Sequence, residues 1–580
     1  MCGIYAITSQ KSNTAERVFK GLQILEYRGY DSWGIAARTN SQKFERIRHI
    51  GKISDSACEV PESSESLGHT RWATCGEVSE ANTHPHTSGS ITLVHNGIVE
   101  NFQSLKEELE SLGYFFVSHT DSEVLAGLID YSLKDQKNKL KALQSVVEKI
   151  EGRSSVVFAI QGERGMYAFT TGLALVVGFE EEESMIASDP MAFTARAQEV
   201  VYMEPGQAGY FNTSQREFYN LDTGEVVYPS SEKWALSDTP SSEKACNEHY
   251  MLREIMEQKK LVRKVMEQSE CIAQLGQAIK NAKQVYLTGC GTAHKVAMLG
   301  AYYLHLCGID AKAVVASEID EYLGLINKDT LCIAISQSGE TADVLCGIER
   351  VQAQGAEIAA ITNVAHSSLA RKASTVLPIY AGAELAVAST KACMNQIAVL
   401  YQVACSISKN IPSTDQDALE ESLAYILSDT SQDAISYFAQ SISSIREIFL
   451  IGSGAYYPLA LEGAIKIAEV SYINAQGFAT GELKHGPLAL IEKGRVCIVL
   501  GSEAKDLRAA AQMRARGAYI VGIAVDTSPE FDIHIPSRGE GFIAHMSTLA
   551  ILQLLSYHLS LARGINPDRP RNLAKSVTVQ

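Results

Sequence analysis

The sequence lacks the features that mark several classes of protein. Its twelve cysteines include no Cys-x-x-Cys pair and no Cys/His cluster at zinc spacing, so we expect neither a disulfide framework nor a metal site. It has no excess of positive charge either, and its net charge of −16 disfavours nucleic acid and anionic membranes as partners. No apolar run looks long enough to span a membrane, and Met1-Cys2-Gly3 does not begin a signal peptide. These absences indicate a cytoplasmic protein whose cysteines are mostly small buried apolar residues.

The chain is long enough for several domains. With 580 residues, it is too long for one hydrophobic core, and we expect two to four domains. The composition, 46% hydrophobic and 20% charged, is ordinary for a globular protein. A small phosphorylated substrate remains compatible with the net negative charge, because a local pocket of hydrogen-bond donors can outweigh distant charges.

Two kinds of organisation follow each other along the chain. Residues 2–230 are typical of a strand-rich domain, and the polar stretch 231–248 is predicted to be a linker. An amphipathic stretch from 249 to about 282 predicts a helix. The second half then repeats itself: 284–293 aligns with 447–456, and 331–335 aligns with 496–500. Each copy alternates strand and helix, which predicts two similar parallel-sheet domains, 249–415 and 416–562, and a tail, 563–580.

One cysteine differs from the others by its position. We expect Met1 to be removed, which would leave Cys2 with a free α-amine. Such an amine has a reference pKa of about 7.7 to 8.0 and can act as the base for its own thiol. By itself, a cysteine at position 2 is weak support for such a role.

Several polar motifs crowd into the same domain as Cys2. Asp121 and Arg71 provide the anion and the cation that bind the ammonium and carboxylate of glutamine, the arginine through a bidentate fork. Asn96 and Gly97 can stabilise the oxyanion that forms from the glutamine amide. Each residue also has a structural interpretation, such as a hairpin turn at Asn-Gly or a core position for Trp72. Their combination favours a glutamine site.

These motifs resemble those of a known family. Cys-Gly-Ile at 2–4, Tyr-Arg-Gly-Tyr-Asp-Ser at 27–32, His-Thr-Arg-Trp-Ala-Thr at 69–74 and His-Asn-Gly-Ile at 95–98 are similar to the class II glutamine amidotransferases. Within that group, the chain resembles the glutamine–fructose-6-phosphate aminotransferase (isomerising) family over its full length. The resemblance implies an α/β multidomain fold: an N-terminal-nucleophile αββα glutaminase domain followed by two doubly wound parallel-sheet sugar isomerase domains.

The resemblance also implies roles in the glutaminase domain. Cys2 would be the nucleophile, and Asn96 and Gly97 would form the oxyanion hole. The implied glutamine contacts are Arg71, Trp72, Thr74, His84 and Asp121, with Trp72 also a gate for ammonia. Cys75 departs from the family, which usually has histidine after Trp-Ala-Thr.

A polar segment in the first repeat is suited to a phosphate group. Residues 336–341, Ser-Gln-Ser-Gly-Glu-Thr, lie between a buried strand and a helical stretch, where hydroxyls and backbone N–H groups can bind a dianion. A serine N-cap with a capping glutamate explains the pattern about as well. In the second repeat, Glu503 takes the place of Ser338 and would repel phosphate. The sequence therefore predicts a phosphate site in the first copy only.

The resemblance places the sugar phosphate on the first copy as well. The implied phosphate contacts are Thr292, Ser336, Gln337, Ser338 and Thr341. The other implied contacts of the sugar phosphate are Val387, Ser389 and Ala574. Ala293 departs from the serine that the family usually has at this position. A lost hydrogen bond to a charged group costs about 1.5 to 3 kcal/mol, so weaker substrate binding is expected unless water replaces it.

Three charged residues of the second copy share one helical face. Glu462, Lys466 and Glu469 follow each other at i, i+4 and i+7. A solvated row of salt bridges is the usual reason for such spacing, but the apolar flanks leave little room for a solvent face. The resemblance implies that Glu469 is the isomerisation base and that Lys466 assists the proton transfer. It further implies ring opening by His485, from a neighbouring subunit, and a Schiff base at Lys575 in the tail.

The combined expectation is an enzyme that uses L-glutamine and fructose 6-phosphate as a homodimer, with no metal or organic cofactor, nucleic acid or membrane. Three alternative functions fit the sequence less well. An isomerase or deglycase with two such α/β domains would not need residues 2–230. An amidotransferase for another acceptor would lack the doubled domain. A non-catalytic sugar-phosphate sensor, suggested by Cys75 and Ala293, would be expected to lose Cys2, Glu469 or Lys575, and all three are present.

Overall fold

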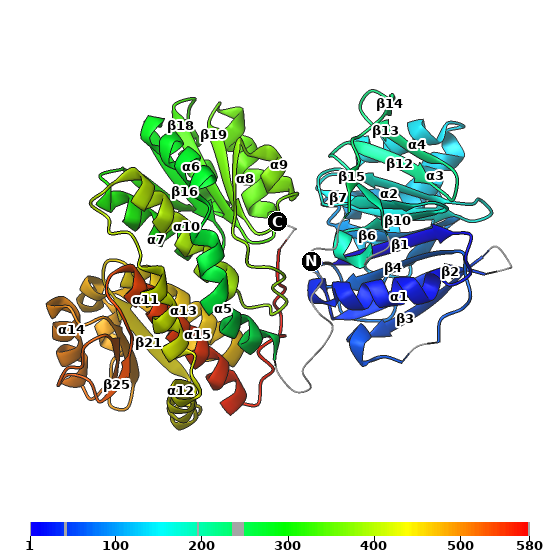
Figure 1. Ribbon diagram of the computed structural model, residues 1–580. Helices are drawn as coiled ribbons and strands as arrows, with labels where there is room; N and C mark the ends of the chain where they lie inside the picture. The colour runs from blue at the N-terminus through cyan, green and yellow to red at the C-terminus, as the bar shows by residue number, and fades with distance from the viewer. Residues whose placement is uncertain (1, 40–42, 58, 194–196, 235–248, 578–580) are drawn as a thin grey trace. The chain divides into compact units, whose positions relative to one another are not determined.

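A computed structural model of the chain describes residues 2–39, 43–57, 59–193, 197–234 and 249–577. These residues divide into two compact units: the first comprises 2–234 together with 576–577, and the second comprises 249–575 (Figure 1). The predicted linker, 231–248, lies mostly outside the described residues. The first part of the predicted linker is not a linker. Glu232–Lys233 forms strand β15, which pairs with β11 and belongs to the first unit.

Two antiparallel sheets form the centre of the first unit. In the described residues, one has the order β15-β11-β9-β10-β1-β4-β2-β3 and the other β14-β13-β12-β8-β7-β6-β5. The strand bounds are β1 Gly3–Ser9, β2 Ser32–Arg38, β3 Phe44–Ile50, β4 Glu65–Arg71, β5 His86–Ser88, β6 Ile91–Gly97, β7 Ser154–Ile160, β8 Met166–Thr170, β9 Val176–Glu180, β10 Glu183–Ala187, β11 Glu199–Tyr202, β12 Gln207–Phe211, β13 Arg216–Asn220 and β14 Val226–Val227.

Helices cover the outer faces of these sheets. Helix α1 (Thr14–Ile24) packs on the first sheet, and α2 (Phe102–Ser111), α3 (Asp121–Asp135) and α4 (Lys139–Lys149) cover the second. Strand β1 is buried along its whole length because it separates two cores. Tyr5 and Ile7 face the core under α1, whereas Ile4 and Ala6 face the core between the sheets, as the alternation of side chains in a strand requires. The αββα arrangement is confirmed.

The second unit contains two parallel five-stranded sheets. The orders are β17-β16-β18-β19-β20 and β22-β21-β23-β24-β25, so the internal repeat of the sequence is a repeat of topology. The bounds are β16 Gln284–Gly289, β17 Ala311–Val315, β18 Thr330–Ser336, β19 Glu357–Thr362, β20 Thr375–Pro378, β21 Glu447–Gly452, β22 Asn474–Ala479, β23 Val496–Leu500, β24 Tyr519–Ala524 and β25 Ile533–Pro536. The two doubly wound sheets are confirmed.

The helices of the second unit surround both sheets, and most of them contribute to one core cluster that includes residues of both repeats. They are α5 Tyr250–Met266, α6 Ser269–Asn281, α7 Thr292–Leu306, α8 Ala342–Ala353, α9 Ser368–Lys372, α10 Lys391–Ile407, α11 Gln416–Ile426, α12 Asp429–Ser441, α13 Tyr456–Ser471, α14 Ala504–Arg514 and α15 Phe542–Ala562. The single helix predicted from 249 to about 282 is in fact two helices, because Gln268 leaves the helical conformation at ψ 61°.

The expectation that no apolar run reaches the length of a membrane span is wrong for helix α15. Its 21 residues have a mean hydropathy of 1.3, enough by length and composition to cross a bilayer. However, 83% of the apolar window is buried inside the protein, where α15 packs on α13 and α12. A helix that is apolar all round is typical of such a central position.

The strand order of the first parallel sheet fixes where its loops meet. The connections after β16 and β18 leave in opposite directions, to β17 on one side and β19 on the other. At such a switch point, the carboxyl ends of two adjacent strands open a crevice for ligands. The turn before α7 and the 336–341 segment before α8 both lie at this edge.

Candidate active sites

A pocket in the first unit brings most of the predicted glutamine-site residues together. It is lined by Cys2, Arg71, Trp72, Thr74, His84, Gly97 and Asp121, and also by Cys75, His95, Thr120 and Ser122, which the sequence did not single out as contacts. Cys2 lies directly before β1, while Arg71 and Gly97 end the strands β4 and β6. The N–H of Trp72 donates to the Cys2 sulfur at 3.3 Å. Residues distant in sequence therefore converge on the thiol because β1 begins there and β4 and β6 end there.

Asn96 is held beside Cys2 by His69, which belongs to one of the sequence motifs but has no predicted role. The Asn96 amide donates to the Cys2 carbonyl oxygen at 3.0 Å, and its own oxygen lies 3.1 Å from Nε2 of His69. The same His69 nitrogen is 3.0 Å from the His95 carbonyl oxygen. Gly97 follows at φ +131°, a conformation that favours glycine, and a Cβ there would lie 2.2 Å from the Arg153 carbonyl oxygen.

Arg71, predicted to bind the glutamine carboxylate through a bidentate fork, also binds its own loop. Its two terminal nitrogens donate to the carbonyl oxygens of Cys75, Gly76 and Glu77, at 2.6, 3.0 and 3.2 Å. The guanidinium binds its own loop because those carbonyls follow β4 by only a few residues. Cys75 thus keeps its backbone contact to Arg71, although its side chain departs from the family.

Four buried histidines lie in or beside this pocket, and burial favours their neutral forms. Desolvation lowers the pKa of His69 to about 3, holds the pKa values of His84 and His86 well below 6.5, and lowers the pKa of His95. The rings of His69 and His84 stack at 4.0 Å, so a charge on either would also repel the other. Both ring nitrogens of His84 are buried without a hydrogen-bond partner in the described residues.

The histidines make a prediction about acid stability. Below about pH 6.5, the unfolded chain gains protons that the folded unit does not, so each histidine lowers the free energy of unfolding by about 1.4 kcal/mol per pH unit. All three tryptophans, Trp33, Trp72 and Trp234, belong to this unit, so their fluorescence in denaturant titrations follows its unfolding. We expect the unfolding free energy to fall steeply between about pH 6.5 and 5, above the range where ordinary carboxylates titrate. A constant value over this interval would contradict neutral buried histidines.

The 336–341 segment follows β18 at the switch point of the first parallel sheet. The Ser336 and Thr341 hydroxyls lie 3.0 Å apart, Ser336 accepts the N–H of Gly339, and Ser338 accepts the N–H of Glu340. Helix α8 begins at Ala342, and Thr341 at its N-cap makes no side-chain cap. The Glu340 carboxylate accepts the N–H of Ser368 at the start of α9. The serine-cap interpretation is therefore wrong, and the segment is a hydroxyl-rich loop at a helix N-terminus.

The three charged residues of α13 form a buried cluster. Glu462 and Lys466 are each 1% exposed, and Lys466 Nζ lies 2.6 Å from Glu469 and 3.6 Å from Glu462. Burial raises the pKa of Glu462 to about 7 despite the neighbouring ammonium, while its two carboxylate neighbours raise the pKa of Lys466 in spite of burial. The Thr292 hydroxyl donates to Glu462 at 3.0 Å, which joins the start of α7 to this cluster. The solvated salt-bridge interpretation is wrong for this face.

The tail docks against the first parallel-sheet domain. Lys575 Nζ lies 2.5 Å from Glu384, and the two side chains are 4% and 0% exposed. The Ser389 hydroxyl also donates to Glu384, and the Val387 N–H donates to the carbonyl of Asp568 in the tail. Burial raises the pKa of Cys393 on α10; the negative charges of Glu462 and Glu384 add to this rise, and the Lys466 ammonium opposes it. Cys393 thus lies close to both the α13 cluster and the carboxylate that binds Lys575.

The structure does not bring His485 into this cluster. His485 ends a short 3-10 helix, Thr480–His485, is exposed, and forms no hydrogen bond or ion pair in the described part of this chain that joins it to the residues above. Ala574 and Gln337 are both half-buried. The backbone carbonyl of Gln337 accepts the N–H of Asn363.

The second parallel sheet has a carboxylate at its switch point, although not the predicted one. Glu503 is largely exposed and pairs with Lys505. Asp506, in the first turn of α14, is instead fully buried and accepts the hydroxyls of Ser453 at 2.8 Å and Thr480 at 2.6 Å. The chain's own carboxylate therefore occupies the edge that carries the hydroxyl loop in the first sheet.

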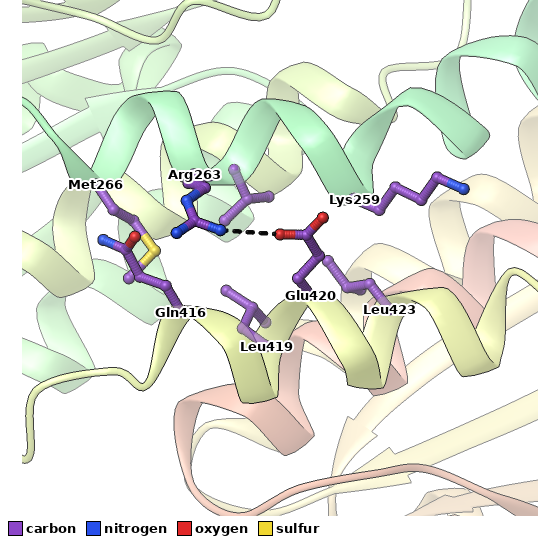
Figure 2. A pocket seen from close by; sticks show the side chains of 8 residues that line it. Lys259, Arg263, Met266, Gln416, Leu419, Glu420 and Leu423 are labelled. Carbon is purple, nitrogen blue, oxygen red and sulfur yellow. Dashed lines mark hydrogen bonds and ion pairs between the residues drawn. The ribbon is translucent and has the colours of Figure 1, made fainter.

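A further hollow in the second unit lies between α5 and α11 (Figure 2). Figure 2 shows Arg263 of α5 directed at Glu420 of α11, a pair at 3.2 Å, with Met266 and Leu419 beside it. Arg263 also pairs with Asp417 at 3.3 Å. None of the predicted site residues lines this hollow in the described structure, so we interpret it as a packing seam between the two helices.

Comparisons with known proteins agree with this arrangement. The sequence matches the Glutamine amidotransferase domain over residues 38–147 and the SIS domain over residues 278–406 and 441–561. Proteins named glutamine–fructose-6-phosphate aminotransferase (isomerising) from Clostridium tetani and Acinetobacter baylyi are each 36% identical, and one from Thermococcus kodakarensis is 35% identical, all over the full length of both chains. The chain belongs to the glutamine–fructose-6-phosphate aminotransferase (isomerising) family.

Solved structures support the fold of the second unit. The C-terminal domain of a glucosamine-fructose-6-phosphate aminotransferase from Francisella tularensis is 30% identical, with a TM-score of 0.51. It covers 57% of this chain and all of that domain. The tagatose-6-phosphate ketose/aldose isomerase of Escherichia coli, 18% identical with a TM-score of 0.50, shares the fold and covers 59% of this chain. The second unit of this family member therefore shares its architecture with both structures.

Proposed function

We propose that this chain hydrolyses glutamine at Cys2 and passes the ammonia to fructose 6-phosphate, which is aminated and isomerised to glucosamine 6-phosphate. The product would feed the synthesis of amino-sugar nucleotides. The observation that carries the proposal is that one chain combines a pocket around Cys2 with a buried lysine, Lys575, beside a second buried acid–base cluster. The full-length relatives carry the corresponding name. The direct test is to incubate the protein with both substrates and to measure glutamate and glucosamine 6-phosphate together.

In the glutaminase half, Cys2 is the nucleophile, activated by its own α-amine after removal of Met1. Asn96 is an oxyanion donor, a role supported by the position of its amide beside Cys2 and by its orientation through His69. Gly97 supplies the second donor. The glutamine contacts are Arg71, Trp72, Thr74, His84 and Asp121. Because Arg71 already binds three carbonyls, it contributes mainly positive charge and the shape of the 75–77 loop.

In the sugar half, the hydroxyl loop binds the phosphate through Ser336, Gln337, Ser338 and Thr341, with Thr292 at the start of α7. The N-termini of α7 and α8 favour a dianion there. Val387, Ser389 and Ala574 contact the sugar. Lys575 forms a Schiff base with the open-chain ketose, Glu469 moves the proton between C1 and C2, and Lys466, 2.6 Å from Glu469, assists this proton transfer. Glu469 suits this role because its side chain remains 27% exposed while its partners are buried.

The remaining proposals concern assembly and location. We propose a homodimer in the cytoplasm, in which His485 of a second copy completes the site and opens the sugar ring. The support is that His485 is exposed in this chain and separate from the cluster it would serve.

Ala293 provides a test of the phosphate site. Ala293→Ser places a hydroxyl in the first turn of α7, next to Thr292, where it can donate to the substrate phosphate. A restored hydrogen bond to a charged group would lower the KM for fructose 6-phosphate by up to about tenfold, with kcat little changed. The measurement is the steady-state isomerisation rate against substrate concentration, with glutamine hydrolysis as the control. An unchanged KM would mean that water or Thr292 already serves that oxygen.

A further inference from the structure

Glu254 is a buried acid that the proposed mechanism leaves without a role. It lies in the second turn of α5 and is 2% exposed. One carboxyl oxygen accepts the backbone N–H groups of Leu385 and Ala386, the latter at 3.2 Å. The other oxygen is buried without a hydrogen-bond partner in the described residues. A buried carboxyl with one oxygen unsatisfied is costly, so this arrangement needs an explanation.

The backbone that Glu254 holds belongs to the sugar-contact segment, 384–392. Glu384 begins this segment and accepts the N–H groups of Thr390 and Ala392 together with the Lys575 ammonium. The first turn of α5 binds the tail in addition, because the N–H groups of Tyr250 and Met251 donate to Asp568. Figure 1 shows the tail, in red, beside α5. Helix α5 therefore fixes both the segment and the tail that meet at the Lys575–Glu384 pair.

The charged groups around Glu254 are already paired with one another. On α5 itself, Arg253 pairs with Glu257 at 3.4 Å, and Lys391 of α10 also binds Glu257, at 2.7 Å. Lys575 of the tail pairs with Glu384, and Asp568 is occupied by the N–H groups of α5. The nearby residue of α15, Gln553, is neutral and bonds Gln258. In the described structure, no lysine or arginine forms an ion pair with Glu254.

This environment shifts the pKa values of the Glu254 and Glu384 carboxyl groups in opposite directions. Burial and the negative charge of Glu384 raise the pKa of Glu254 above its usual range. Burial also acts on Glu384, but the Lys575 ammonium and the N–H groups of Ala392 and Thr390 outweigh it and lower the pKa of Glu384. Near neutral pH, these shifts favour one negative charge, on Glu384, and one proton, on Glu254.

We propose that Glu254 is a positioning residue for the Schiff-base step: one oxygen holds the 385–386 backbone, and the proton on the other keeps the carboxyl pair singly charged. Glu384 can then accept one proton from the Lys575 ammonium, which yields a neutral amine and a carboxylic acid. The amine adds to the C2 carbonyl of open-chain fructose 6-phosphate, and loss of water gives the imine. Ionised Glu254 would repel the Glu384 carboxylate more strongly than it attracts the Lys575 ammonium, and would destabilise the buried pair that holds Lys575 in place. The proposal rests on the proposed role of Lys575.

The test uses the full-length chain with Glu254→Gln, Glu254→Ala and, as a matched control on the same helix, Glu257→Gln. The glutamine amide can still accept the two N–H groups and is neutral at every pH. We measure isomerisation of fructose 6-phosphate without glutamine from pH 6 to 10, borohydride trapping on Lys575, and glutamine hydrolysis as an internal check of folding.

We expect Glu254→Gln to isomerise within about twofold of the wild type at pH 7 and to keep its rate at alkaline pH, where the wild type and Glu257→Gln decline. Glu254→Ala should lose at least about tenfold in kcat, because both functions of the carboxyl are lost. Identical alkaline profiles for wild type and Glu254→Gln, or a tenfold loss in Glu254→Gln at pH 7, would overturn the proposal. Absence of a trapped adduct in the wild type would instead refute the Lys575 role itself, and this inference with it.

Discussion

Replacement of Cys2 by alanine is expected to abolish glutamine-dependent synthesis of glucosamine 6-phosphate. The thiol is the only nucleophile proposed for the amide carbon, and loss of a covalent nucleophile lowers turnover by about a thousandfold or more. Conversion of fructose 6-phosphate to glucose 6-phosphate should survive, because the residues of that reaction belong to the other compact unit. The measurement compares glutamate release and isomerisation in the same preparation.

Cys75→Ala is the matched control for this experiment. Cys75 is the second thiol of the pocket, but it binds Arg71 through its backbone carbonyl, which alanine retains. This variant should keep most of the glutaminase activity. If Cys75→Ala abolishes glutamine hydrolysis and Cys2→Ala does not, the nucleophile is Cys75 and the assignment of Cys2 is wrong. If a folded Cys2→Ala protein also loses isomerisation, the two sites are not independent.

Lys575→Arg is expected to eliminate both synthesis and isomerisation while the protein still folds. Arginine preserves the positive charge beside Glu384, so the buried carboxylate keeps an ion pair and the tail stays docked. Arginine does not form a Schiff base, because it cannot be deprotonated in a protein. We expect both sugar activities to fall by about a thousandfold or more, with glutamine hydrolysis retained in part.

Borohydride trapping distinguishes a chemical role from a structural one. With fructose 6-phosphate, the wild type should yield a reduced adduct that mass spectrometry locates on Lys575, and Lys575→Arg should yield none. Lys391→Arg is the matched control, since Lys391 is also buried and paired with a glutamate. It should retain the adduct. A fully active Lys575→Arg enzyme would refute the Schiff-base role and make Lys575 a structural anchor of the tail.

The sequence by itself determined the elements whose signals are local. The repeated strand–turn–helix pattern predicted two equivalent parallel sheets, because buried strands and their glycine-rich turns have distinctive periodicity. The apolar residues around Glu462, Lys466 and Glu469 likewise indicated a buried face, since they leave no stripe for solvent. The motifs around Cys2, Arg71 and Asn96 predicted a shared site, and the pocket contains most of them.

Only the tertiary structure decided which groups bind each other across long separations in the chain. Arg71 binds the carbonyls of its own loop, Thr292 binds Glu462, and Asp506 instead of Glu503 occupies the second switch point. Such choices depend on how strand ends and helix starts meet, and no local pattern encodes that geometry. Glu254 is the clearest case: in sequence it is one acid among several on an amphipathic helix. Its burial against the 385–386 backbone, 131 residues away, gives it a chemistry of its own.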